Sequence, residues 1–227
     1  MDKYAGLDDL PQRVAIFPLE GALLLPRAQL PLNIFEPRYV QMVSDAMSGD
    51  RIIGMIQPEA GISADELNDP AIDVPIFKTG CAGRITSYTE TPDGRLIITL
   101  SGVARFQVKQ ELARVTPYRI CEVDFAVFKS DLDAGRGEDA VDRDGLIEIF
   151  RKYLDANSMQ ADWNEVENAT TESLVNTLCV ISPFAAREKQ AMLEAATLYD
   201  RASVLVALTE MALASGPGAE IEHSQLQ

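Results

Sequence analysis

The stretch FPLEGALLLPRAQLPLNIFEPRYVQMV, residues 17–43, decides how the first part of this chain folds. Apolar segments around Phe17-Pro18 and Pro31–Phe35 predict short strands, and their prolines restrict such strands to sheet edges or bends. Glu36-Pro37 predicts the start of a helix. Proline suits a first helical position, and Glu36 can meet the free N–H groups and the positive end of the helix dipole. An apolar stripe at helical spacing follows, formed by Tyr39, Met42, Val43, Ala46 and Met47.

This strand-to-helix corner has two interpretations. The structural one is a junction fixed by Pro37 and capped by Glu36, with Arg38 paired to a carboxylate or a carbonyl group. The functional one is an edge that binds a partner. The three residues Leu23–Leu25 share this ambiguity, because they suit either the core or contact with an extended peptide.

Residues 12–128 are mostly strand-like. The clearest hairpin joins Arg84–Glu90 to Arg95–Leu100 through Asp93-Gly94, which supplies the positive φ angles that a tight turn needs. Many short strands separated by glycine and proline predict a small barrel or sandwich. Residues 58–75 predict a long loop, and a loop of that length is often functional.

The composition changes after the strand-rich part. Residues 129–141, KSDLDAGRGEDAV, are polar and acidic and predict a linker. Residues 142–214 carry successive apolar stripes at helical spacing and predict a helical bundle. Residues 215–227 predict a flexible acidic tail. The expected fold class is therefore α+β, with strands first and helices second.

Composition excludes several classes of function. The 227 residues carry a net charge of −15 with a pI near 4.4, so nucleic acids and anionic membranes would repel the chain. One histidine, His223 near the C-terminus, excludes a folded Ser-His-Asp triad and a His-rich zinc site. Phosphate-binding loops are absent from the sequence. We therefore expect no catalytic residues, no metal and no cofactor.

The three cysteines, Cys81, Cys121 and Cys179, have no spacing typical of redox or zinc chemistry. An odd number of scattered cysteines indicates reduced thiols in a cytoplasmic protein. We expect all three to be small buried apolar side chains.

Several motifs together resemble the LON substrate-binding domain, the N-terminal domain of ATP-dependent Lon proteases. The resemblance spans about residues 12–213 and is strongest at residues 34–39, IFEPRY. The other matching motifs are Phe17-Pro18-Leu19, Leu25-Pro26, Pro31-Leu32, Gly80–Ile85, Asp93-Gly94-Arg95, Gly102–Phe106 and Arg187–Ala195.

The resemblance implies a PUA-like β-barrel with one helix, followed by a C-terminal helical bundle, and a role in recognising protein substrates. The sequence ends before an ATPase or protease module could begin, so we expect neither activity to carry over. We expect a stand-alone, cytoplasmic, non-enzymatic module that binds exposed polypeptide or a protein partner. Candidate contacts are Leu23, Leu24, Leu25 and the 58–75 loop. The alternatives are a small carboxylate-based enzyme and an RNA-binding PUA-like module.

Overall fold

A computed structural model describes residues 4–59, 66 and 74–215. Two compact units, Met1–Ala134 and Gly135–Gln227, divide the chain. Most of the predicted 58–75 loop and residues 216–227 of the predicted tail, including His223, lie outside the described residues. Each unit is described by itself.

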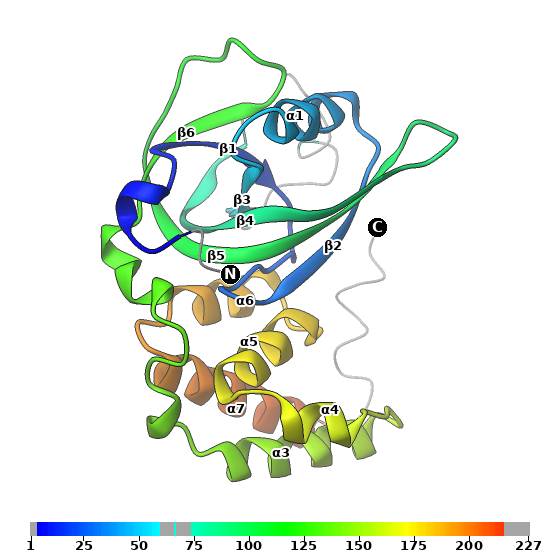
Figure 1. Cartoon of the computed structure of the whole chain (residues 1–227). Helices are drawn as coiled ribbons and strands as arrows, with labels where there is room; N and C mark the ends of the chain where they lie inside the picture. Colours follow the sequence, from blue (N-terminus) through cyan, green and yellow to red (C-terminus); the bar gives the residue numbers. More distant parts are fainter. Residues whose placement is uncertain (1–3, 60–65, 67–73, 216–227) are drawn as a thin grey trace. The chain divides into compact units, whose positions relative to one another are not determined.

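The first unit is built around a closed β-barrel (Figure 1). The sheet order is β2-β5-β4-β3-β1-β6, and an additional pairing of β5 with β6 closes the ring. Strands β1 and β3 run parallel, and the other pairs are antiparallel. The elements are η1 (Leu7–Asp9), β1 (Arg13–Pro18), β2 (Gln29–Ile34), α1 (Pro37–Met47), β3 (Ile52–Pro58), β4 (Ile76–Glu90), β5 (Leu96–Glu111), β6 (Arg119–Asp124) and η2 (Ala126–Leu132).

The long strand β5 makes closure possible because its two halves pair with different neighbours. Its first half pairs with β2 and its second half with β6, while β4 runs beside most of its length. Phe106 projects from β5 into the barrel core and is fully buried beside Val14, Ile16 and Cys121. The helix α1 packs against β1 and β3 through Met42 and Val43, which are also fully buried.

Gly102 lies at an irregularity in the pairing of β4 with β5. The backbone of residues 25–28, just before β2, packs directly against it. The Arg27 amide donates to the Gly102 carbonyl at 2.8 Å, and the Gly102 amide donates to the Ala28 carbonyl at 2.9 Å. A Cβ atom at position 102 would overlap the Leu25 carbonyl oxygen. Only glycine therefore allows β5 to accept the chain at this point.

Replacing this glycine tests the close approach. We expect Gly102→Ala to lower the free energy of unfolding by about 1–3 kcal/mol or more, because the new methyl group overlaps backbone atoms that cannot move alone. Gly6→Ala is the matched control, since nothing lies within 4 Å of its Cβ position. Denaturant melts of both variants give the measurement, and equal stabilities would contradict the packing described.

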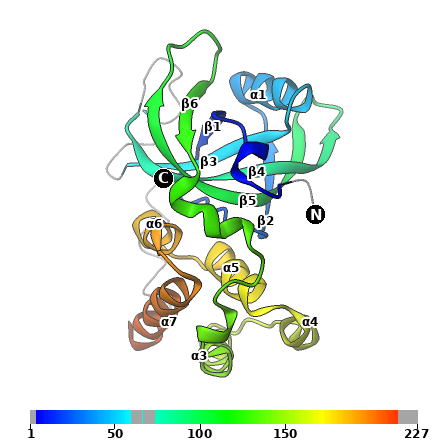
Figure 2. The same ribbon diagram turned by 60° about the vertical axis from the view of Figure 1, so that its left-hand side comes forward.

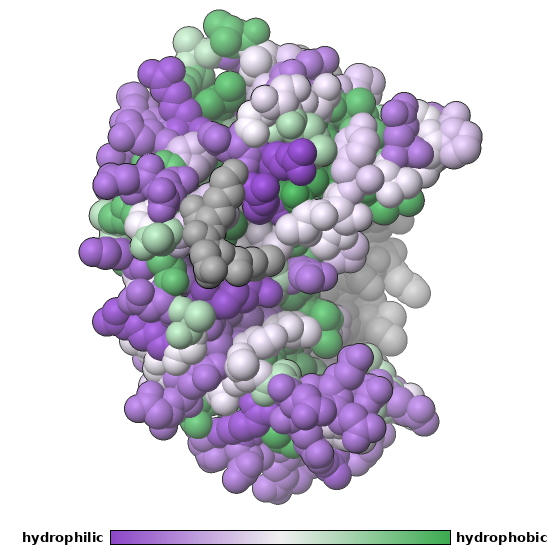
Figure 3. All heavy atoms as spheres, viewed as in Figure 1, coloured by the Kyte–Doolittle hydropathy of each residue, from purple (hydrophilic) through white to green (hydrophobic). Residues whose placement is uncertain are grey.

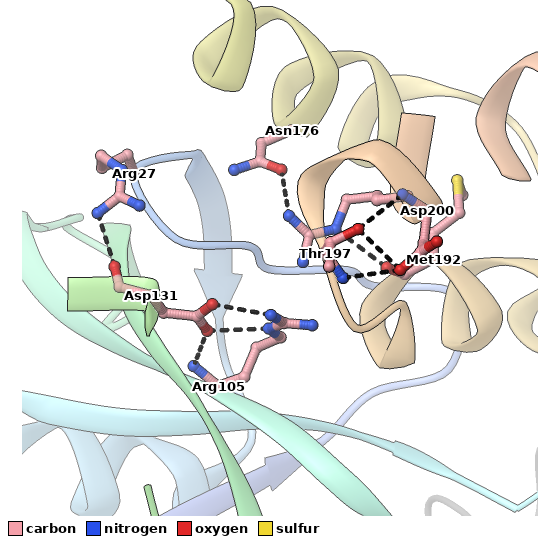
Figure 4. A network of polar contacts seen from close by, with 8 residues as sticks. Arg27, Arg105, Asp131, Asn176, Met192, Thr197 and Asp200 are labelled. Carbon is pink, nitrogen blue, oxygen red and sulfur yellow. Dashed lines mark hydrogen bonds and ion pairs between the residues drawn. The ribbon is translucent and has the colours of Figure 1, made fainter. Parts of the chain in front are cut away.

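The second unit is helical, and its longest helix, α7, packs against α3, α5 and α6 (Figure 2). Buried Arg201 of α7 donates to the Asn176 side-chain oxygen of α5 at 2.8 Å and to the Met192 carbonyl of α6 at 3.1 Å (Figure 4). This arginine therefore ties three helices together. The elements are η3 (Glu138–Ala140), α3 (Arg143–Ala156), α4 (Trp163–Asn168), α5 (Thr171–Ile181), α6 (Ala186–Glu194) and α7 (Leu198–Ser215).

The predicted α+β class, a barrel followed by helices, is confirmed. The predicted linker 129–141 holds the end of η2 and the whole of η3, and the proposed domain boundaries stay predictions. In the described residues, no helix is long and apolar enough to cross a membrane.

Candidate functional site

The structure buries the three leucines that the sequence offers as peptide contacts. Leu23, Leu24 and Leu25 are 2%, 1% and 0% exposed. The Leu24 side chain lies over Gly83 of β4, within the first unit. In this conformation the three side chains belong to the interior, so they would need to become exposed before they could contact a peptide.

The corner at residues 35–39 has the predicted strand-to-helix course, but Glu36 does not cap the helix with its side chain. The Glu36 carboxylate instead accepts from Arg38, at 2.9 Å from Nε and 2.8 Å from the nearer terminal nitrogen. The backbone amides of Tyr39 and Val40 donate to the Glu36 main-chain carbonyl, both at 2.9 Å. The predicted side-chain cap is therefore wrong, because a guanidinium two residues away competes for the carboxylate.

The two aromatic residues of this corner have opposite surroundings. Tyr39 is buried, its ring centroid lies 4.2 Å from that of Phe17, and the Arg38 guanidinium lies over its ring at 4.6 Å. Burial raises the pKa of Tyr39. Phe35, in contrast, is 63% exposed. The corner thus anchors α1 with Tyr39 and leaves Phe35 available at the surface.

A neutral surface extends from this corner over the outer face of β2, β5 and β4. Side chains alternate along β5, so Leu96, Ile98 and Leu100 face the core while Ile97, Thr99 and Ser101 share the opposite face. On that face Ile97 is exposed, Thr99 is half-buried and Ser101 is buried. Pairing sets Asn33 and Thr89 beside Ile97, Pro31 and Ser87 beside Thr99, and Gln29 beside Ser101. We call these eight residues the neutral strip: Gln29, Pro31, Asn33, Ser87, Thr89, Ile97, Thr99 and Ser101.

The neutral strip carries no charged side chain, although the chain holds 35 acidic residues. Ile97 is 49% exposed at one end, where it pairs with Asn33, two residues before Phe35. Arg95 lies with its guanidinium 6.0 Å from the Phe35 ring and pairs with Asp93 at 3.0 Å. The surface over the β4–β5 hairpin, at the right of Figure 3, is mostly pale. The strip therefore offers apolar and uncharged polar contacts to a partner.

The other end of the neutral strip meets a pocket of about 510 Å³. Arg84 lies in this pocket, in the row of Ser101, and donates to the Tyr4 hydroxyl at 3.2 Å and the Asp50 carbonyl at 3.3 Å. Arg27 contributes a second guanidinium. Among the residues that the structure describes, the lining is Tyr4, Ala5, Arg27, Arg84, Thr86, Ser101, Gly102, Val103, Leu132 and Ala134.

A buried ion pair holds the wall of this pocket (Figure 4). Asp131 of η2 accepts from Arg105 of β5 three times, from the amide at 2.9 Å and from two guanidinium nitrogens at 2.8 Å. The side chains are 7% and 3% exposed, and the Arg105 guanidinium also stacks over Phe128 at 4.3 Å. The Asp131 carbonyl in turn accepts from Arg27 at 2.8 Å. The pair thus fixes both η2 and Arg27.

Removing one partner of this ion pair should destabilise the first unit strongly. We expect Asp131→Ala to lower the free energy of unfolding by about 3–5 kcal/mol, because it leaves the Arg105 charge buried without its carboxylate. Glu148→Gln is the matched control, since Glu148 pairs with Lys152 at 2.7 Å on an exposed helix surface. Thermal and denaturant melts should show a large loss for the first variant and none for the second.

The cysteines lie where the sequence predicts, buried and without disulfides. Burial raises the pKa of Cys121 to about 11 and that of Cys179 to about 12. No group of three or more His, Cys, Asp or Glu side chains in the described residues is arranged to hold a metal ion.

Thiol chemistry provides a direct check of this burial. At pH 8 the thiolate form of a group with such a pKa is on the order of one part in a thousand or less, and access is blocked as well. We expect the native protein to react slowly with a disulfide-exchange reagent and three thiols to react after unfolding. Rapid native reaction would mean that the barrel or the helices open in solution.

The neutral strip was not foreseen from the sequence, because it depends on which strands pair. The one local signal is the alternation of apolar core residues with other uncharged residues from Leu96 to Ser101. It indicates that the outward face of β5 carries no charge here. That this face adjoins uncharged residues of β2 and β4 emerges only from the register.

Comparison with known proteins shows which family this sequence resembles. The family model of the "ATP-dependent protease La (LON) substrate-binding domain" matches residues 13–210. Lon protease of Flavobacterium johnsoniae is 25% identical over 198 residues, which cover 86% of this chain and 23% of the relative. Lon protease 1 of Herpetosiphon aurantiacus is 28% identical over 118 residues, which cover 52% of this chain and 14% of the relative.

Solved structures share the fold. The crystal structure of a Lon N-terminal domain protein from Xanthomonas campestris matches with a TM-score of 0.55 and 22% identity, covering 91% of this chain and all of that one. The N-terminal domain of Lon protease from Mycobacterium avium complex matches with a TM-score of 0.61 and 15% identity, covering 87% and 98%. The chain spans only about a quarter or less of the two Lon proteases compared above.

Proposed function

This chain belongs to the family of LON substrate-binding domains, and from that membership we propose that it binds exposed apolar segments of other polypeptides along the neutral strip, without catalysing a reaction. The observation that carries the proposal is the neutral strip itself. It is a mostly exposed, uncharged surface, with Phe35 and Ile97 at one end, on a chain of net charge −15.

The chemistry of the strip suits an extended, unfolded partner. Such segments present apolar side chains and unpaired amide groups, which the exposed Ile97 and Phe35 and the amide side chains of Gln29 and Asn33 complement. Pro31 has no amide hydrogen, so it weakens β2 as a template for an added strand. We therefore propose contact over the face of the strip, not continuation of the sheet past β2.

The negative net charge of the chain and the lack of charge on the strip favour some partners over others. Repulsion discourages nucleic acids and acidic segments, and apolar contact dominates where a partner docks. Binding of this kind depends weakly on salt, because it does not arise from ion pairs. The affinity should be modest, since an extended peptide loses conformational freedom when it binds.

Fluorescence anisotropy with a labelled, permanently unfolded polypeptide tests the proposal. We expect saturable binding that largely survives high salt, and an affinity about tenfold lower in the double variant Phe35→Ser/Ile97→Ser, which loses two apolar contacts. Val115→Ser is the matched control, because Val115 is 89% exposed and lies outside the strip.

Three outcomes would contradict this proposal. Equal loss in the control variant would mean that binding is not located on the strip. Tighter binding of single-stranded RNA than of polypeptide would favour a nucleic-acid module. Absence of binding to any unfolded polypeptide would favour one specific folded partner.

A further inference from the structure

The pocket beside Ser101 has a chemistry that apolar peptide recognition does not use. Two guanidinium groups, from Arg27 and Arg84, and the hydroxyl groups of Tyr4, Thr86 and Ser101 line it. None of the ten described residues that line it carries a carboxylate. Among the described residues, the Arg84 side chain donates only to neutral oxygen atoms, the Tyr4 hydroxyl and the Asp50 main-chain carbonyl. Donors and positive charge therefore gather here, within an acidic chain.

The two arginines are held in place before any ligand arrives. The Arg27 side chain donates to the Asp131 carbonyl, and its backbone is fixed to Gly102 by the hydrogen bond at 2.8 Å. Arg27 also keeps a φ of 64°, a left-handed conformation that an arginine adopts only when its surroundings impose it. A preorganised cation loses little freedom on binding an anion, which increases affinity.

The pocket lies in line with the neutral strip. Ile97, Thr99 and Ser101 follow one another on the same face of β5, and Arg84 pairs with Ser101. Ile97 and Ser101 are roughly 13 Å apart along the strand, a distance that about four extended residues span. Beyond Ser101, residues from other segments form walls: Tyr4 and Ala5 precede β1, and Leu132 and Ala134 lie at and after the end of η2.

We propose that this pocket binds the C-terminal carboxylate of a polypeptide whose preceding residues lie along the neutral strip, an inference that rests on the proposed function. The walls favour a chain end over an internal acidic side chain, because a continuing chain would meet them. Arg84 and Arg27 supply charge-assisted hydrogen bonds to the carboxylate, and Val103 and Leu132 contact the last side chain. The module would then recognise two features of an unfolded chain, its apolar side chains and its C-terminal end.

Two labelled peptides of identical apolar sequence test this directly, one ending in a free carboxylate and the other in an amide. We expect the acid to bind about tenfold more tightly, which corresponds to roughly 1.4 kcal/mol. The difference should shrink at high salt, while the binding of the amide changes little.

Substitutions locate the effect. Arg84→Gln should remove most of the preference for the acid, with a much smaller effect on binding of the amide. Arg187→Gln is the matched control, because it removes the same charge from an exposed position of α6. Thr86→Glu gives a second variant that keeps Arg84 in place. Its new carboxylate at an exposed pocket residue should weaken binding of the acid peptide by repulsion, and weaken binding of the amide much less.

The outcomes separate this proposal from the one it rests on. If the acid and the amide bind equally to the unaltered protein, carboxylate recognition is overturned, and polypeptide binding along the strip stands. Inorganic phosphate is titrated at constant ionic strength. If it binds with a dissociation constant in the low millimolar range while the two peptides bind equally, the pocket is a general anion site and the proposal fails. If neither peptide binds, the proposed function itself fails.

Discussion

The buried ion pair between Arg105 and Asp131 is the interaction on which the first unit depends. Burying two charges is costly, and here three hydrogen bonds to the carboxylate and the stacking of the guanidinium on Phe128 offset that cost. The pair fastens η2 to β5 at the point where the chain leaves the barrel. It also directs the Asp131 carbonyl to Arg27, so one contact organises both the exit of the chain and the pocket wall.

The segment Gly102–Phe106 shows how one short motif serves several physical needs. Gly102 leaves room for the Leu25 carbonyl, Arg105 forms the buried ion pair, and Phe106 fills the barrel core. Each position fails for a different reason if it is changed: overlap of backbone atoms, an uncompensated charge, or a cavity. The part of the sequence that resembles the LON family at this point is therefore the part where β5 changes neighbours and the ring closes.

Local patterns predict the elements of this fold better than its site. Asp93-Gly94 and the proline at position 37 act within a few residues, so the hairpin and the start of α1 follow from sequence alone. Glu36 shows the limit of such reasoning, because its carboxylate pairs with Arg38 and not with the free amides of the helix. Asp131 stands in a segment whose composition predicts a linker, and its burial depends on Arg105, 26 residues away. The neutral strip likewise depends on strand register, which alternation in one segment cannot reveal.

The absence of charge on the strip is informative because the rest of the chain is so acidic. With 35 acidic residues available, eight adjacent strand positions without one are consistent with a surface that must exclude carboxylates from contact with a partner. A carboxylate among them would repel the terminal carboxylate of a bound chain and would remain hydrated beneath its apolar side chains. The neutral strip thus offers uncharged contacts along most of its length, and Arg84 adds positive charge beside its Ser101 end. An extended chain that follows the strip would bind in a single direction, with its C-terminus toward Arg84.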